Sequence, residues 1–501
     1  MPQALTYPGV YVEEIPSGVR TITGVATSIT LFIGWAPKGR TDRAERIGSF
    51  AEFERKFGGL STDSYLGYAV KQFFDNGGSD AYVVRIVAKG GGAPKTAAQT
   101  FNGLNIEATS PGKWGNQIKV VPSGTAASFR LDVIDTGSDG TANNLVESFV
   151  NLSMASADRR FVESVVNDNS GFITVDVTSA TVPNTAQKLI NGTDGTILAP
   201  TGTTAAAFNA AVTALLGVGT VVDQIELFNM ICVPGLVDGA TITALQGYAK
   251  KKRAFLIVDS AENATAEASG STGVGAPANM PTQSNADNSA LYFPWVLAPD
   301  PLQSAALTSY PPCGFVAGVL ARTDATRGVW KAPAGTDATV NGAIGFAHNL
   351  SEDQIGRLNP RGVNCLRSMR VYGNVVWGAR TLHGDDDRGS EYKYVPVRRM
   401  ALFLEESLYR GTQWVVFEPN DEPLWSQIRL NIGAFLHGLF RQGAFQGLTP
   451  RDAYFVKCDR ETTTQADINL GIVNILVGFA PLKPAEFVVL KLQQIAGDIP
   501  T

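Results

Sequence analysis

The sequence predicts a multidomain protein of mixed class, in which a central α/β domain is interrupted by an all-β insertion and followed by a compact α+β domain. An extended β-strand arm is expected at each end of the chain. The length of 501 residues is enough for about three domains. Apolar runs of strand length alternate with helical patterns through much of the chain, and strand-like segments at the two ends lie outside any domain pattern.

The central α/β domain is expected in two parts, residues 21–99 and residues 199–370. Four apolar runs have the length of a buried strand: Ser28–Trp35, Ala81–Val87, Leu227–Val233 and Ala254–Asp259. Helical patterns accompany them at residues 50–57, 64–74 and 241–251. Because strands and helices alternate, the economical arrangement is a parallel sheet with crossover helices.

Two stretches interrupt this alternation. Within residues 100–198 helical periodicity fades, and short β-branched segments are separated by Gly, Ser, Asn and Asp turns, which predicts the all-β insertion. Residues 261–290 hold few side chains that could pack in a core, so we expect an exposed loop there.

Residues 371–482 are predicted to form the compact α+β domain. Its first helix begins at Pro396 and ends at Gly411, with an apolar face formed by Val397, Met400, Ala401, Leu404 and Leu408. A second helix follows the capping sequence at residues 420–423 and ends at Gly443, with an apolar face formed by Ile428, Ile432, Phe435, Leu436 and Leu439. Strands are expected at residues 414–417, 453–457 and 472–477.

The two ends of the chain, residues 1–20 and 483–501, are predicted to be strands outside the body of any domain. The arm residues are Tyr7, Val10, Tyr11, Val12, Glu13 and Ile15 at the N-terminal end, and Phe487, Val488, Val489, Leu490, Lys491 and Leu492 at the C-terminal end. A detached strand leaves its backbone groups unpaired, so it is either a solvent-exposed tail or a partner for the sheet of another chain. Because the C-terminal arm is too apolar to remain in water, we prefer strand exchange between subunits.

Charge and composition exclude several classes of function. The 41 Lys and Arg residues stand against 46 Asp and Glu, a net charge of −5, so no bulk positive field favours direct nucleic acid binding. No apolar stretch approaches the 18 residues of a membrane span, so no membrane insertion is expected. The first residues lack the pattern of a secretory signal, which places synthesis in the cytoplasm. Four widely spaced cysteines suit buried thiols in a reducing compartment: Cys232, Cys313, Cys365 and Cys458.

The residue types that carry catalysis are sparse. The histidines are His348, His383 and His437. The run from His383 to Asp387 resembles a metal site but lacks the spacing of a calcium loop, and no nucleophile elbow, phosphate loop or dinucleotide motif is present. We therefore expect no catalytic residue, no metal and no cofactor. One alternative left open is an α/β enzyme that uses the region Leu227–Asp259, with Asp259 or His383 as a functional group.

Four stretches of sequence carry a resemblance to a known family. They are YPGVYVEEIPSG near the start; LYFPWVLAPDP with GFVAGVLARTDATRGVWKAP; VWGARTL at residues 376–382; and RRMALFLEESLYRGTQWVVFEPND with FVKCD and APLKPAEFVVLKL. With these motifs in this order, the sequence resembles a contractile tail sheath protein of contractile-tailed phages, phage-tail-like bacteriocins and related contractile injection systems. The motifs touch both termini and most of residues 285–495.

The resemblance implies a structural subunit that polymerises as a six-fold helical sleeve around an inner tube and contracts to drive that tube through a target envelope. It implies a C-terminal domain against the tube, an insertion that faces outward, and arms that add to the sheets of neighbouring subunits.

The implied partners are further copies of the chain, the inner tail tube protein, and baseplate and tail terminator proteins. The particle would be assembled in the bacterial cytoplasm as part of a phage tail or contractile injection device. Candidate tube-facing residues are Glu405, Glu406 and Arg410 on the first C-terminal helix, and the second helix is an equal candidate. Another tail or baseplate component is the alternative structural role.

Overall fold

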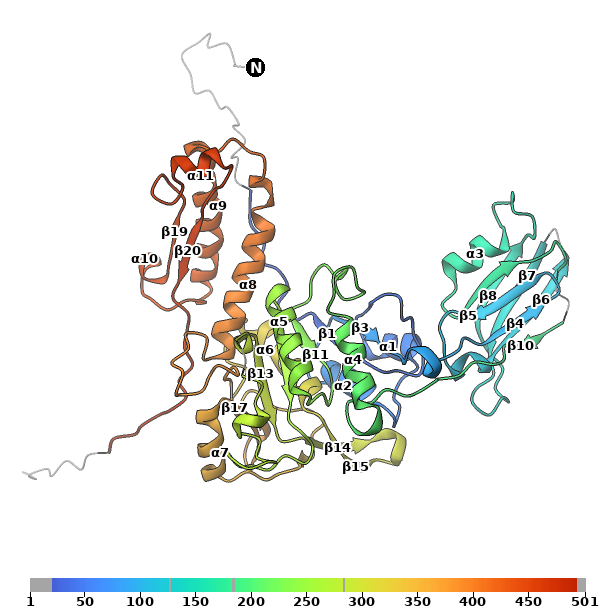
Figure 1. Cartoon of the computed structure of the whole chain (residues 1–501), viewed down its shortest axis with the longest axis horizontal. Helices are drawn as coiled ribbons and strands as arrows, with labels where there is room; N and C mark the ends of the chain where they lie inside the picture. Colours follow the sequence, from blue (N-terminus) through green and yellow to red (C-terminus); the bar gives the residue numbers. More distant parts are fainter. Residues whose placement is uncertain (1–19, 126–127, 183–184, 283, 493–501) are drawn as a thin grey trace, which may run out of the picture. The chain divides into compact units, whose positions relative to one another are not determined.

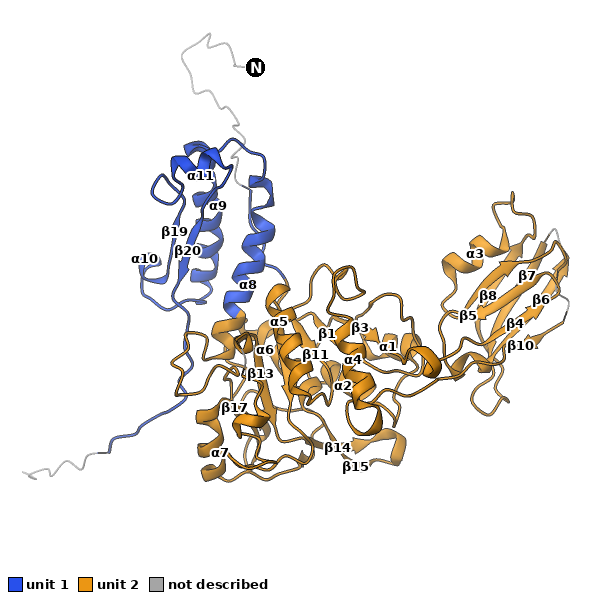
Figure 2. Cartoon of the chain, viewed as in Figure 1, with its two compact units in different colours: residues 1–25, 400–501 blue, residues 26–399 orange. Residues whose placement is uncertain are grey.

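A computed structural model describes residues 20–125, 128–182, 185–282 and 284–492 (Figure 1). These residues form two compact units that divide at 25/26 and at 399/400, so the smaller unit combines residues 20–25 with residues 400–492 (Figure 2). The sequence-based boundary at 370/371 falls instead within a β-hairpin that completes the sheet of the larger unit. The N-terminal arm residues Tyr7, Val10, Tyr11, Val12, Glu13 and Ile15 lie outside the described residues.

An eight-stranded sheet of order β18-β17-β13-β12-β11-β1-β3-β2 is the centre of the larger unit. Its strands are β1 (Thr30–Gly34), β2 (Glu45–Ile47), β3 (Ala81–Arg85), β11 (Met230–Cys232), β12 (Phe255–Asp259), β13 (Ser289–Phe293), β17 (Val363–Met369) and β18 (Gly373–Val376). The six inner strands pair in parallel, whereas β2 and β18 pair antiparallel at the two edges. Strands β1, β12 and β13 are buried along their whole length, as expected where helices cover both faces.

Helices connect these strands. They are α1 (Phe50–Phe57), α2 (Leu66–Asp75), α4 (Ala205–Ala214), α5 (Gly239–Lys251), α6 (Cys313–Arg327) and α7 (Glu352–Leu358). Local sequence explains where they begin, because Ser49 and Asp238 cap α1 and α5 with side-chain oxygens. Glycine explains how α6 approaches α2: a Cβ at Gly314 would lie 2.5 Å from the Ala69 carbonyl oxygen. The predicted parallel sheet with crossover helices is confirmed.

Residues 97–190, which contain most of the predicted insertion, fold into two small sheets around a separate apolar core. One sheet contains β4 (Ala98–Phe101), β5 (Leu104–Ala108) and β9 (Ile173–Val177), and the other β6 (Ile118–Thr125), β7 (Ser128–Asp135), β8 (Asn144–Leu152) and β10 (Gln187–Lys188). The expectation of an all-β insertion is wrong in one element, since α3 (Val162–Asn169) packs Val162 and Val166 into the same core. We call residues 97–190 the insertion.

The segment at residues 261–290 differs from its prediction. We expected an exposed loop, yet several of its small and apolar side chains are buried in the core of the larger unit: Ala264, Ala266, Val274, Met280 and Ala286. The physical reason is that alanine and valine side chains fill narrow spaces without a visible periodic pattern. A three-stranded sheet follows it, formed by β14 (Val296–Asp300), β15 (Ala306–Tyr310) and β16 (Gly345–Phe346).

The smaller unit contains the two predicted amphipathic helices. Its elements are α8 (Val395–Gly411, entering the unit at Met400), α9 (Glu422–Arg441), α10 (Pro450–Ala453), β19 (Tyr454–Lys457), α11 (Gln465–Asn469) and β20 (Leu476–Phe479). The apolar face of α9 is buried, including Ile428, Ile432 and Leu436. The strand expected at residues 414–417 is instead a short 3₁₀ turn, Gln413–Val415, followed by Phe417 with a left-handed backbone (φ 69°).

Candidate assembly surfaces

The two-stranded sheet of the smaller unit is open at both edges. Within the described residues, β19 and β20 pair only with each other, in antiparallel register. One face is half-buried, whereas the other exposes Phe455 and Leu476 at 49% and 52%. The ring of Phe455 lies over Gly478, where a Cβ would come within 2.1 Å of it. A hairpin with unpaired outer edges, whose outer face carries Phe455 and Leu476 together with Lys457, is suited to receive further strands.

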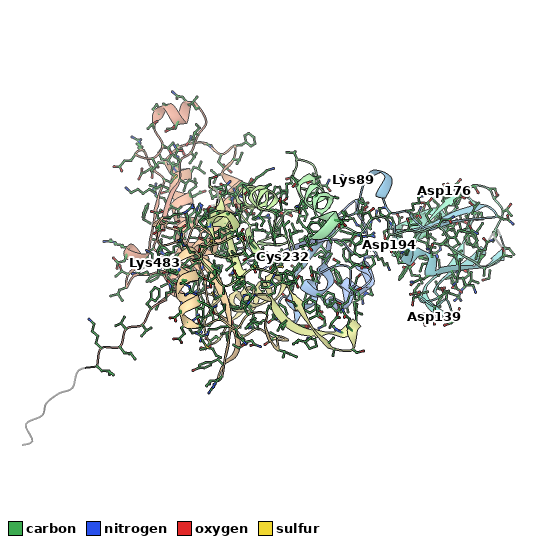
Figure 3. The ribbon with its side chains drawn as sticks, turned by 60° about the horizontal axis from the view of Figure 1, so that its bottom comes forward. Lys89, Asp139, Asp176, Asp194, Cys232 and Lys483 are labelled. Carbon is green, nitrogen blue, oxygen red and sulfur yellow. The ribbon has the colours of Figure 1, made fainter. Side chains whose placement is uncertain are left out.

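The C-terminal arm supplies a segment of matching character. Residues 483–492 have no regular secondary structure, and Lys483, labelled in Figure 3, lies at the start of this stretch. Its apolar side chains are 74–97% exposed: Phe487, Val488, Val489, Leu490 and Leu492. Lys491 is exposed as well. Five neighbouring apolar side chains in water are unfavourable for an isolated chain, and such a segment is typical of an interaction surface.

Residues 20–25 fix the base of the N-terminal arm to α8. Ile22 is buried against Gly411, where an added Cβ would lie 2.6 Å from the isoleucine Cγ2. The backbone N–H of Val25 donates to Ser407 Oγ at 3.2 Å. The Arg20 guanidinium lies 4.8 Å from the centre of the Trp414 ring. The smaller unit therefore anchors the points from which both arms leave.

The three candidate tube-facing residues lie within two turns of α8 but differ in exposure. Glu405 is exposed, whereas Glu406 is 6% exposed and accepts a hydrogen bond from Arg410 Nε at 2.6 Å. Arg410 is half-buried. The Glu406–Arg410 pair is therefore largely an internal feature of the unit, and Glu405 is the member of the set whose side chain is exposed.

The sequence pattern did not indicate which side chains of α9 are accessible in the folded unit. The exposed face of this helix presents a row of accessible side chains at helical spacing: Gln427, Leu430, Ala434, His437 and Arg441. Gly433 and Gly438 stand beside this row with open space where a Cβ would be. The buried apolar face predicted the orientation of the helix, but only the folded unit shows that the opposite face is almost free of charge.

The enzyme alternative centred on Asp259 can be judged from its surroundings. Asp259 is buried at the end of β12 and accepts backbone hydrogen bonds from Gly235 N at 2.9 Å and Cys313 N at 2.8 Å. Burial raises the pKa of this carboxyl to about 6, against the opposing effect of these hydrogen bonds. Both carboxylate oxygens thus join the turn after β11 to the start of α6, which is a structural role.

A cavity of about 540 Å³ adjoins the end of β12, where the N-terminal turn of α5 meets residues 261–281. Among the described residues that line it, Asp259 is the only one with a titratable side chain, and its oxygens are already engaged. The space therefore lacks the converging acid and base groups of a hydrolytic site.

The acidic loop after His383 forms ion pairs. Asp386 accepts from Arg380 Nη1 at 2.9 Å and from Lys393 Nζ at 2.5 Å, and the hydrogen bond from Lys393 is the main cause that lowers its pKa. Asp385 lies 2.7 Å from Arg388. Within the described part of the chain, no group of three or more His, Cys, Asp or Glu side chains is arranged to hold a metal ion. Nor is any helix there both long and apolar enough to cross a bilayer.

The open hairpin and the exposed apolar arm are features by which a structural subunit can associate with other chains. Two family models match this sequence, the phage tail sheath protein central domain over residues 201–382 and the phage tail sheath C-terminal domain over residues 387–495. The chain belongs to the family of contractile tail sheath proteins, as the motifs led us to expect. The insertion lies before both matched ranges.

Relatives agree with this membership. A protein named as a prophage major tail sheath protein of Pseudomonas aeruginosa strain UCBPP-PA14 is 26% identical over 280 residues, which cover 54% of this chain and 67% of that protein. The fold is similar to that of the sheath in a contracted PVC extracellular contractile injection system, with a TM-score of 0.60, 22% identity and 99% of both chains covered. It is also similar to the sheath tail protein of Listeria innocua, with a TM-score of 0.61, 13% identity, and 92% of this chain and 96% of that chain covered.

Proposed function

We propose that this chain is a non-enzymatic subunit that polymerises as a six-fold helical sleeve around an inner tube and contracts to drive the tube through a target envelope. One observation carries the proposal. In a chain that belongs to the sheath family, the smaller unit has both an open two-stranded sheet and an exposed apolar arm. Structures of similar fold are named as a sheath complex and a helical sheath, both in a contracted state.

Strand addition is the proposed link between subunits. The C-terminal arm, with Phe487–Leu492, and the N-terminal arm, with Tyr7–Ile15, would each extend the β19–β20 hairpin of a neighbouring copy. Backbone hydrogen bonds would satisfy the open edges of that sheet, and apolar arm side chains would cover Phe455 and Leu476. Such links tolerate rearrangement of the subunit bodies, because the arms can remain paired while the contacts between bodies change.

The inner tube is the proposed partner of the smaller unit, which contains most of the predicted C-terminal domain (residues 371–482). Glu405 on α8 is exposed and would attract basic groups of a tube through screened interactions that release when the sleeve widens. The exposed face of α9 is the second candidate. Replacing Glu405 by lysine should weaken tube-templated assembly, and Glu54→Lys on α1, also at an exposed position, provides the control. If the two variants assemble equally well on the tube, Glu405 does not face it.

The remaining proposed contacts are at the ends of the sleeve, with baseplate and tail terminator proteins, in a particle assembled in the bacterial cytoplasm. A chain of similar fold occurs in a structure of the AFP baseplate, with a TM-score of 0.57 and 24% identity. That observation also keeps open the second candidate, a subunit confined to the baseplate. Long polymers of this chain alone would exclude it.

Removal of residues 485–501 tests the proposal. The described part of this segment has no regular secondary structure and is exposed except at Glu486, which is half-buried, so the shortened chain should fold with a nearly unchanged melting temperature. It should remain monomeric at concentrations where the full chain forms polymers in sedimentation experiments. Normal polymers from the shortened chain would contradict the role of the C-terminal arm.

A further inference from the structure

The insertion is joined to the central domain by two connections that pair with each other. Lys95 N donates to Thr193 O at 2.9 Å, and Thr193 N donates to Lys95 O at 3.0 Å. Three consecutive glycines at residues 90–92 precede the first connection, and Gly195 on the second has a left-handed backbone. A pair of strands bordered by glycines gives little resistance to rotation, so a fixed orientation of the insertion needs further contacts.

Such contacts exist between the loop after β1 and the start of η2 in the insertion (Lys113–Gln117). Gly39 N donates to Ser110 Oγ at 3.1 Å, in a buried position. A Cβ at Gly112 would lie 2.5 Å from the carbonyl oxygen of Pro37, so the two loops touch backbone to backbone. The loop after β1 therefore packs directly on the insertion.

Arg85 occupies the centre of this contact. Its side chain is buried, and its guanidinium donates to carbonyl oxygens on both sides: Ala36 (2.7 Å), Pro37 (3.2 Å) and Gly39 (2.7 Å) in the central domain, and Pro111 (2.8 Å) in the insertion. Burial lowers its pKa to about 10, opposed by the charge of Asp194, which is labelled in Figure 3. Four hydrogen bonds to backbone satisfy the buried cation and hold the two loops in register.

Lys38 adds a second cation of a different kind. Its residue is 9% exposed, and its Nζ lies 4.4 Å from the centre of the Trp114 ring and 4.0 Å from that of Phe172. The two rings meet edge to face at 6.3 Å, and Trp114 Nε1 donates to Ser110 O at 3.2 Å, which fixes the indole. A lysine from one domain is thus enclosed by two aromatic faces of the other.

Two acidic groups of the insertion favour the ammonium form of this lysine. Asp135 at the end of β7 and Glu147 on β8 attract it, and both belong to the insertion. Burial has the larger effect and lowers the pKa of Lys38 to about 8. At pH 7 the ammonium therefore exceeds the neutral amine by about tenfold, so the aromatic rings face a cation.

We infer that Lys38 latches the insertion to the central domain, with its ammonium held between Trp114 and Phe172 while Arg85 bridges the loops beside it, so that the two parts move as one body. The latch is a property of the single chain and is independent of polymerisation. Its consequence in a sheath, that the insertion follows the central domain when subunits rearrange, rests on the proposed function.

Distances between spin labels test the latch in the full-length chain. Labels at Asn143→Cys in the insertion and Lys250→Cys on α5 both replace exposed residues, and the four native thiols are buried. At pH 7 we expect one narrow distance distribution. Lys38→Met keeps the length of the side chain and removes its charge, which should raise the ratio of open to closed forms roughly tenfold and broaden the distribution. Lys113→Met, which changes an exposed lysine beside Trp114, should leave it narrow.

Alkaline pH separates the charge from the packing of the lysine stem. At pH 9 the neutral amine of Lys38 exceeds the ammonium about tenfold, whereas Arg85, with its pKa of about 10, remains mostly charged. The distance distribution of the parent chain should therefore broaden, whereas that of Lys38→Met should not change further. Phe172→Leu, which keeps an apolar side chain but removes the ring, should broaden the distribution at pH 7. A distribution that is broad in the parent chain at pH 7, or that ignores both Lys38→Met and alkaline pH, would overturn the latch.

Discussion

Replacing Leu490 by lysine tests the proposed strand addition at the level of one side chain. Successive residues of a strand point to opposite faces, so Val488, Leu490 and Leu492 share one face of the C-terminal arm, and Val489 and Lys491 share the other with Phe487. The wholly apolar face is the one expected to be covered. Leu490 is 82% exposed in the single chain, so nearly all of its surface is available for burial by a neighbour.

The size of the effect follows from that exposure. Burying a leucine side chain stabilises by about 1.5–3 kcal/mol, and about 2 kcal/mol corresponds to a roughly 30-fold change in an association constant. The concentration at which Leu490→Lys polymerises should therefore rise by roughly 30-fold. Val489→Lys is the matched control on the face that already carries Lys491, and we expect a change of about twofold or less.

Sedimentation velocity over a concentration series measures the threshold concentration at which each variant polymerises. Thermal unfolding of the single chains provides the folding control. Because both residues are more than three-quarters exposed, neither substitution should shift the melting temperature. Equal thresholds for the two variants would refute strand addition through this face. A threshold unchanged from the parent in both variants would refute burial of the arm altogether.

Three further predictions concern the single chain, each measured by unfolding in denaturant. Gly411→Ala forces Ile22 away from α8 and should cost about 1–3 kcal/mol, whereas Gly433→Ala, with open space around its Cβ, should stabilise α9 by about 0.5–1 kcal/mol; equal effects would contradict the described packing. Asp324→Ala leaves the Arg399 guanidinium buried without the carboxylate it contacts at 2.6 and 2.9 Å, and should cost about 3–5 kcal/mol; a loss below about 1 kcal/mol would contradict that pairing. Because the folded-state pKa of Asp259 is raised to about 6, its protonated form is favoured in the fold, and its contribution to stability is present below pH 4 and lost as the pH rises through 6. Relative to Asp259→Asn, the parent should therefore gain about 1 kcal/mol between pH 7 and pH 5, and a loss over that interval would contradict the burial of this carboxyl.

Strong patterns made much of the fold predictable. The run Ala254–Asp259 is continuously apolar up to its last residue because a parallel strand covered on both faces buries every side chain, and β12 is that strand. The two C-terminal helices were predictable for a related reason, since each must bury one stripe of side chains. The predicted bounds of both helices agree with the observed ones to within about two residues, since α8 spans Val395–Gly411 and α9 spans Glu422–Arg441.

The differences have physical causes of their own. Residues 414–417 are β-branched and aromatic, yet the chain turns there and Phe417 adopts a left-handed backbone, which propensity alone does not indicate. The helix α3 has only eight residues and two buried valines, too short a pattern to stand out. Burial of Ala264 and Ala266 depends on neighbours that are distant in the sequence.

The candidate site was only partly accessible from sequence. The prediction of a C-terminal arm was possible because the run of apolar residues at 487–492 is visible in the sequence itself and does not depend on contacts with other parts of the chain. By contrast, Glu406 and Glu405 are adjacent and equivalent in the sequence, and only the packing of α8 separates the buried one from the exposed one. Nothing in the sequence links Lys38 to Trp114 and Phe172, because their contact depends on how the insertion folds.

Electron microscopy of the purified full-length chain tests the central claim most directly. A subunit that completes its sheets with strands of its own copies should form hollow, ridged cylinders of uniform diameter, with six-fold symmetry in end views, and the Leu490→Lys variant at the same concentration should not. Globular particles of uniform size at every concentration, with no difference between the parent chain and the variant, would contradict the account.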